Sequence, residues 1–174
     1  MVEEFVLVEP SIKYRLDVME YKKEFIECGD YINGGAGLTK INSYEDWLKR
    51  IDEDKKGKPP RYEFLMIRKK DNKIIGLTNI RRSLENGYEI SGGHIGYSIR
   101  PSERGNGYAN IILKLSLNYC RSLGIKKILV TCEKNNVASK KAILKNGGII
   151  ENEIVLADEC IERYWINFQF NNRS

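Results

Sequence analysis

The chain has 174 residues, of which 41% are hydrophobic and 30% are charged, and its formal net charge is +5. These values are those of a soluble globular protein, long enough for one domain over residues 1–174 with a substantial core. The longest apolar runs are only a few residues, which excludes a membrane-spanning helix, and the N-terminal segment MVEEFVLVEPS lacks the features of an export signal. The cytoplasm is therefore the expected location.

Cysteine and histidine usage argues against a metal centre. Cys28, Cys120, Cys132 and Cys160 are widely spaced, with no C-x-x-C pair, and the chain has a single histidine. This pattern fits neither a structural zinc site nor a disulfide framework. No metal is expected.

The first half of the chain predicts two helices followed by a strand pair. A helix beginning at Ser11 has Leu16, Met19, Phe25 and Ile26 among its apolar residues. The glycine-rich segment 31–38 lacks the Walker spacing and is expected to be a flexible loop that could act as a lid. The expected elements are strand 5–8, helix 11–28, a helix from residue 42 or 43, and a hairpin of strands 62–68 and 74–81.

The second half alternates strands and helices. A strand expected to start near Tyr88 ends before Pro101, and a helix and a buried apolar strand follow it, which implies a right-handed crossover and a parallel strand pair. The complete order, β-α-α-β-β-β-α-β-α-β-β, predicts an α+β fold: a mixed, mostly antiparallel twisted sheet of about seven strands with a central parallel pair and about four helices. The expected elements here are strand 94–99, helix 109–123, strand 128–131, helix 136–146, and strands 149–156 and 161–168.

The segment 92–109, GGHIGYSIRPSERGNGYA, organises the rest of the chain. It is a strand, a turn and a glycine-rich loop that opens into a helix. Such a loop presents backbone N–H groups at the positive end of a helix dipole, which suits a phosphate, and Arg104 can add a charge-assisted bond. An ordinary strand-to-helix turn with a surface arginine is the alternative.

Two motifs in this half resemble a known family. Arg104-x-x-Gly107-x-Ala109 matches the acetyl-CoA pyrophosphate signature (Gln/Arg)-x-x-Gly-x-(Gly/Ala) of the GNAT superfamily of N-acetyltransferases, and Asn136-x-x-Ser139 resembles its second cofactor segment. The element order is also similar to that fold. A Rossmann loop would need a third glycine near residue 110, where the chain has asparagine.

The resemblance implies how acetyl-CoA would bind. The pantetheine arm would lie along the strand near residue 98 like an added strand, and the loop would take the pyrophosphate. Lys140, Lys141 and Lys145 are candidates to face the phosphates. Many family members carry a tyrosine, which can protonate the departing thiolate, where this chain has Ile143. The cofactor-binding residues implied are Tyr97, Ser98, Ile99, Arg104, Gly105, Asn106, Gly107, Tyr108, Ala109, Asn136 and Ser139.

Acetyl transfer to an amine needs a base, because an amine with a pKa of about 10 is mostly protonated at neutral pH. His94 and Glu89 are the candidates; the alternatives are a packed histidine and a solvated glutamate. Tyr97 is a candidate to donate a proton to the departing thiolate; the alternative is an aromatic residue packed in the core. Cys120 and Cys132 fit small core residues better than nucleophiles, so direct transfer in a ternary complex is expected.

The sequence therefore predicts an acetyl-CoA-dependent N-acetyltransferase acting on a small-molecule amine or a protein N-terminus. The alternative is a noncatalytic acyl-CoA-binding sensor or interaction module. The basic segment 121–145, with seven basic residues and one acid, allows nucleic-acid binding, but it lacks interleaved aromatics, so nucleic acid is not the expected partner. The final hairpin has an edge able to pair across a two-fold axis, so a homodimer is one expected assembly.

Overall fold

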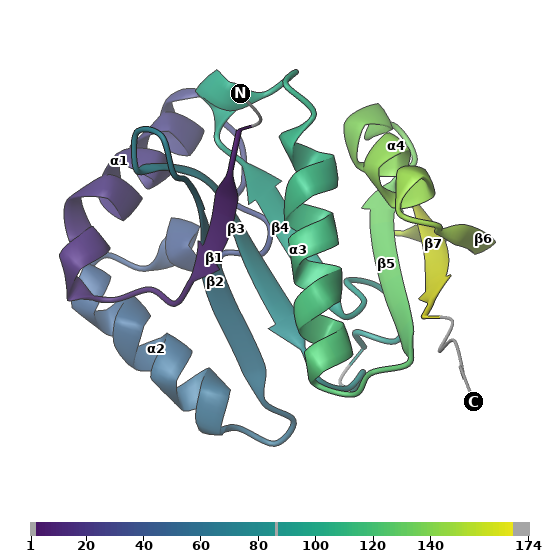
Figure 1. Ribbon diagram of the computed structural model, residues 1–174. Coiled ribbons are helices and arrows are strands. Elements are labelled where there is room, and N and C mark those ends of the chain that lie inside the picture. Colours follow the sequence, from purple (N-terminus) through teal and green to yellow (C-terminus); the bar gives the residue numbers. More distant parts are fainter. Residues whose placement is uncertain (1–2, 86, 169–174) are drawn as a thin grey trace, which may run out of the picture.

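The computed structural model describes residues 3–85 and 87–168 (Figure 1). Within them the chain follows the predicted order of strands and helices. The elements are β1 (Phe5–Val8), α1 (Arg15–Glu27), α2 (Tyr44–Lys56), β2 (Arg61–Arg68), β3 (Lys73–Arg81), β4 (Ile95–Ile99), α3 (Tyr108–Ser122), β5 (Lys127–Glu133), α4 (Val137–Lys145), β6 (Ile149–Leu156) and β7 (Glu159–Asn167).

The strands form two antiparallel sheets, ordered β1-β2-β3-β4 and β5-β7-β6. The arrows of β4 and β5 point the same way in Figure 1, as expected for a β-α-β crossover through α3. These two strands share no continuous ladder. They are joined just before β4, where the His94 N–H donates to the Leu129 carbonyl at 2.8 Å and the Leu129 N–H donates to His94 Nδ1 at 2.9 Å. The expected central parallel pair is therefore a junction between sheets.

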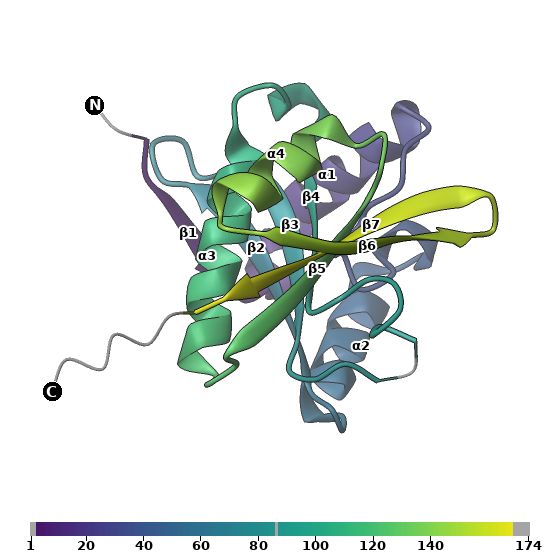
Figure 2. The ribbon, with the colours of Figure 1, turned by 90° about the vertical axis from the view of Figure 1, so that its right-hand side faces the viewer.

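Helices cover both faces of the first sheet, because successive side chains of its central strands point to opposite faces and are apolar on both. Leu65 of β2 belongs to the cluster that includes Trp47 of α2, whereas its neighbour Met66 packs with Ile112 of α3. Figure 2 shows the hairpin of β6 and β7 extending away from the helices. No helix in the described ranges is long and apolar enough to cross a bilayer.

Local signals set several element boundaries correctly. The hairpin of β2 and β3 forms as predicted, and Ser43 caps α2 by accepting a bond from the Asp46 N–H at 3.1 Å. One detail differs: the first helix starts at Arg15, after a short 3-10 turn, and not at Ser11. Leu16 and Ile26 on it are 82% and 57% exposed, because the face toward the sheet is Val18, Tyr21 and Phe25.

The glycine-rich segment between α1 and α2 is anchored, in contrast to the expected flexible lid. Ile32 and Leu38 are buried, and Trp47 Nε1 donates to the Gly35 carbonyl at 2.9 Å. Gly34 lies so close to Gly96 of β4 that a Cβ there would be 2.2 Å from the Gly96 carbonyl oxygen. This contact places the segment against the edge of the first sheet.

Candidate functional site

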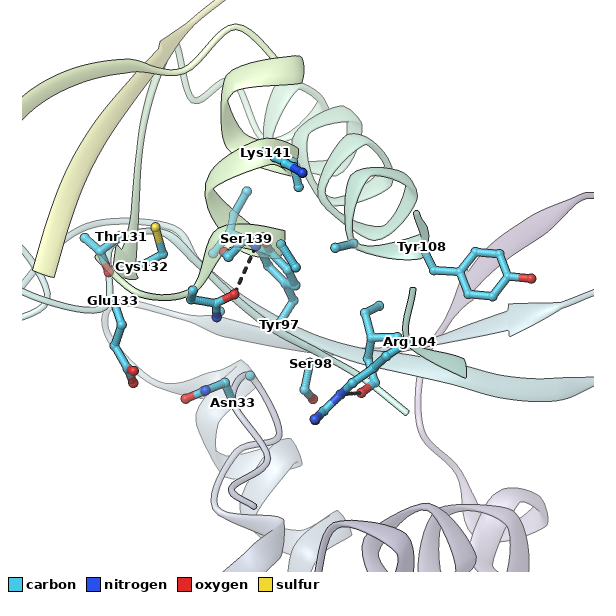
Figure 3. A pocket seen from close by; sticks show the side chains of 18 of the residues that line it. Asn33, Tyr97, Ser98, Arg104, Tyr108, Thr131, Cys132, Glu133, Ser139 and Lys141 are labelled. Atoms are coloured by element: carbon cyan, nitrogen blue, oxygen red, sulfur yellow. Dashed lines mark hydrogen bonds between the residues drawn. The ribbon is translucent and has the colours of Figure 1, made fainter. Parts of the chain in front are cut away.

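A cavity of about 980 Å³ opens where the two sheets separate (Figure 3). Its walls are β4, the N-termini of α3 and α4, the end of β5 and the α1–α2 segment. Of the residues that the sequence resemblance assigns to the cofactor, those on this wall are Tyr97, Ser98, Ile99, Arg104, Gly105, Gly107, Tyr108, Ala109, Asn136 and Ser139. Asn106 is not on it, and its amide Nδ2 donates to the Glu103 carbonyl at 3.1 Å.

One backbone edge of β4 faces this cavity. The Arg81 N–H donates to the His94 carbonyl and the Arg100 N–H to the Ile75 carbonyl, so even-numbered positions direct their backbone groups toward β3. Because these directions alternate along a strand, the N–H and C=O groups of Tyr97 and Ile99 point to the opposite side. An extended ligand could therefore pair with β4 as an added strand.

The loop before α3 offers a group of backbone donors. Gly105 and Gly107 have φ of 83° and 77°, a left-handed conformation that favours glycine, and no atom lies within 4 Å of a Cβ built on either. Among the described residues, the N–H groups of 105–109 donate to no protein acceptor. They lie at the N-terminus of the 15-residue helix α3. Free donors, open space and the helix dipole together fit a diphosphate.

Two charged residues hold this loop in place. Arg104 Nη2 donates to Asp30 Oδ2 at 2.7 Å and its Nε donates to the Ile99 carbonyl at 3.2 Å, so the loop is tied to the α1–α2 segment and to β4. Glu103 is bonded by Arg68 at 2.8 Å and by Lys73 at 2.7 Å. Arg68 and then Lys73 lower the Glu103 pKa despite partial burial. The negative charge of Glu103, next to the loop, is therefore offset by the positive charges of Arg68 and Lys73. The sequence did not reveal this role of the two cations.

Helix α4 supplies the facing wall. Asn136 Oδ1 accepts from the Ser139 N–H at 3.1 Å and caps the helix. The Tyr97 hydroxyl and Ser139 Oγ are 2.7 Å apart, and burial raises the pKa of Tyr97 to about 12. Lys140 bonds to Glu162 at 2.6 Å and is not on the wall, whereas Lys141 and Lys145 are; Ile143 is fully buried.

Neither predicted base lies on the cavity wall. His94 is 6% exposed, its Nδ1 accepts the bond from Leu129, and burial lowers its pKa to about 4. Glu89 was expected on the same strand as His94, which is wrong: β4 begins at Ile95, and Glu89 is in an exposed turn where its Oε2 accepts from the Gly87 N–H at 3.0 Å. The physical reason is that the positive φ of Gly87, Gly92 and Gly93 turns the chain before β4.

Other residues reach the cavity that sequence reasoning did not select. Asn33 of the α1–α2 segment, Arg81 at the end of β3, and Thr131 and Glu133 of β5 lie on its wall. The sequence offered one signal for this group: Glu133 is the single acid in a basic segment and directly follows an apolar strand. Cys132 also lines the wall, but burial, followed by the charge of Glu162, raises the pKa of its thiol to about 11, so it stays protonated at neutral pH.

The family follows from comparison of the sequence with known families. A family model described as an acetyltransferase (GNAT) domain matches residues 17–149. The chain belongs to the GNAT acetyltransferase family. Members of this GNAT family use acetyl-CoA, and the donors, strand edge and open glycine loop described above fit that molecule. No curated protein matches the sequence.

Solved structures show the same GNAT fold at low sequence identity. Mycobacterium smegmatis RimJ in complex with CoA-disulfide has a TM-score of 0.72 at 14% identity, covering 94% of this chain and 81% of that one. Ribosomal-protein-S5-alanine acetyltransferase from Vibrio fischeri has a TM-score of 0.69 at 14% identity, covering 96% and 97%. A spermidine N-acetyltransferase chimera from Vibrio cholerae and hSSAT has a TM-score of 0.65 at 14% identity, covering 94% of this chain and 95% of that one.

Proposed function

We propose that the protein transfers an acetyl group from acetyl-CoA to a primary amine, directly, in a ternary complex. The observation that carries the proposal is that the free N–H groups of residues 105–109 and the edge of β4 that is not paired with β3 open into one cavity. This arrangement holds a diphosphate at one end and an extended arm along the strand.

Acetyl-CoA supplies an acetyl group activated as a thioester. The chain's own residues bind and orient it: residues 105–109 donate to the diphosphate, and Lys141 and Lys145 add positive charge from α4. The backbone at Tyr97 and Ile99 aligns the arm, and backbone N–H groups there are able to stabilise an oxyanion. Asn136 keeps α4 capped beside the arm.

Direct transfer is favoured over an acetyl-cysteine intermediate. Cys132 is the cysteine on the cavity wall among the described residues, and the raised pKa of its thiol leaves almost no thiolate at neutral pH. Burial also raises the pKa of Cys120, to about 12, within the core. Transfer without a covalent enzyme intermediate therefore needs the amine and acetyl-CoA bound together.

The acceptor is proposed to be a small-molecule amine or a protein N-terminus. Structural neighbours include an acetyltransferase described as modifying the N-terminal serine of ribosomal protein L7/L12 and one described as a spermidine N-acetyltransferase. The cavity adjoins the α1–α2 segment and β5, which leaves space for an amine beside the thioester end.

The test is release of free thiol from acetyl-CoA in the presence of an amine panel containing spermidine and peptides with N-terminal serine or alanine. The proposal predicts thiol release with at least one acceptor and double-reciprocal lines that intersect. Parallel lines would contradict direct transfer. Binding of acetyl-CoA by calorimetry without thiol release on any acceptor would instead support the noncatalytic acyl-CoA-binding module.

A further inference from the structure

We propose that Glu133 is the general base that takes the proton from the acceptor amine. This inference rests on the proposed acetyl transfer. It assigns the base to a residue at the end of β5, in place of His94 and Glu89, which the structure places away from the cavity.

Glu133 is at the end of the cavity opposite the phosphate loop. It is the last residue of β5, and because side chains alternate along a strand it shares a face with Thr131, whereas Cys132 packs into the core cluster. Figure 3 shows the Glu133 carboxylate and the Asn33 amide at one end of the cavity and Arg104 at the other, with Tyr97 and Ser139 between them. A ligand held by the loop would extend toward Glu133.

Glu133 is also the carboxylate left free to accept a proton. Three carboxylates line the cavity. Asp30 is paired with Arg104, and Glu103 is paired with Arg68 and Lys73. In residues 3–85 and 87–168, Glu133 forms no side-chain hydrogen bond or ion pair. Its exposed carboxylate can bind an ammonium group and pass the proton to water.

Charged residues from several elements surround the cavity at Glu133. Cys132 adjoins it on β5 as a neutral thiol, and Glu162 of β7 is paired with Lys140. The other charged residues on the cavity wall are Asp30, Arg81, Glu103, Arg104, Lys141 and Lys145. The cations Arg81, Lys141 and Lys145 on this wall disfavour acceptors with several positive charges.

In the proposed reaction, proton transfer to Glu133 precedes attack on the thioester. The acceptor ammonium gives one proton to the Glu133 carboxylate, and the amine lone pair then attacks the thioester carbonyl carbon. As the C–N bond forms and the C–S bond breaks, the electron pair leaves with sulfur, and the second amine proton restores the thiol. Glu133 releases its proton to water, so the products are an acetamide, free CoA and one proton.

The experiment compares Glu133→Gln, Glu133→Asp and Glu159→Gln from pH 6 to 9. The probe is a peptide with an N-terminal serine, or spermidine where the peptide is not acetylated. Glu159 is the matched control: it is an exposed glutamate at the start of β7, outside the cavity. Glu133 is exposed, and its side chain forms no hydrogen bond or ion pair with the part of the chain that the structure describes, so its variants should fold and bind CoA in calorimetry like the natural protein.

Glu133→Gln is expected to lower kcat/KM about 100-fold at pH 7 with unchanged CoA affinity. Without the base, the enzyme depends on neutral amine, whose fraction rises tenfold per pH unit up to a pKa of about 8 for an N-terminus. The defect should therefore shrink as pH rises. Glu133→Asp should recover most of the activity with the natural pH profile, and Glu159→Gln should match the natural protein.

A Glu133→Gln defect that is absent, or equal at every pH, would overturn the assignment of the base. Loss of activity in Glu159→Gln of the same size would overturn it too. Absence of thiol release by the natural protein with every acceptor is a different result, because it refutes the proposed acetyl transfer itself.

Discussion

The hydroxyl groups of Tyr97 and Ser139 are hydrogen-bonded at 2.7 Å across the opening between the two sheets. Tyr97 belongs to β4 and Ser139 to the first turn of α4, so the bond connects elements that the backbone ladders do not. Both residues are on the cavity wall. This bond sets the separation of β4 and α4 where the arm of acetyl-CoA is proposed to lie.

Tyr97→Phe is expected to lower the free energy of unfolding by about 1 kcal/mol, because Ser139 Oγ loses a buried partner. Ser139→Ala should cost a similar amount, and the double variant less than the sum of the two. Urea denaturation measures all three. Tyr31→Phe is the control, because Tyr31 is exposed and its hydroxyl has no bond in the described residues. Strict additivity would show that the bond contributes nothing.

Gly107→Ala is expected to lose most of its acetyl-CoA affinity. A side chain at φ 77° costs about 1–2 kcal/mol, and the new Cβ enters the open space in front of the loop donors. Gly124→Ala is a matched control, since Gly124 has φ 75°, equally open surroundings and no place on the cavity wall. Thermal unfolding should show similar losses for both variants, and calorimetry should show weaker binding for Gly107→Ala alone. Equal affinities would refute the phosphate role of the loop.

The lowered pKa of His94 should make the stability of the protein depend on pH. Its folded pKa of about 4 is below the unfolded value of about 6.5, so the unfolded chain binds more protons between these values and stability rises with pH. The contribution is complete above pH 6.5 and is lost as pH falls to 4, a difference of roughly 3 kcal/mol. His94→Asn keeps an acceptor for the Leu129 N–H but cannot titrate there. This variant removes the sole histidine of the chain. Its free energy of unfolding, measured from pH 7 to 4.5, should fall less steeply than that of the natural protein; identical slopes would contradict the prediction.

Cys132→Ala is expected to retain acetyl transfer, because the protonated Cys132 thiol is not a nucleophile in the proposed reaction. Mass spectrometry after incubation with acetyl-CoA should detect no acetylated Cys132. In the natural protein, a thiol reagent should label the exposed Cys28 well before Cys132, which confirms that the assay detects accessible thiols. Loss of turnover in Cys132→Ala, with CoA affinity preserved, would support a covalent route instead.

Short-range patterns predicted the parts of the molecule that depend on neighbouring residues. The β2–β3 hairpin and the Ser43 cap arise from turn and capping residues a few positions apart. Leu16 and Ile26 are the counterexample: both are apolar residues on α1, yet they face solvent, since the orientation of a helix is set by the sheet beneath it. Burial therefore could not be read from apolar character alone.

The sequence by itself determined the strand, glycine loop and helix that present the N–H groups of residues 105–109, because the backbone conformations of Gly105 and Gly107 orient them locally. Only the tertiary structure decided which side chains share the cavity. The contact between His94 and Leu129, 35 positions apart, joins β4 to β5 at one end and so directs His94 into the junction. The end of β5 lines the cavity where the two sheets separate, so the place of Glu133 on the wall depends on long-range packing, although its isolated negative charge was visible in the sequence.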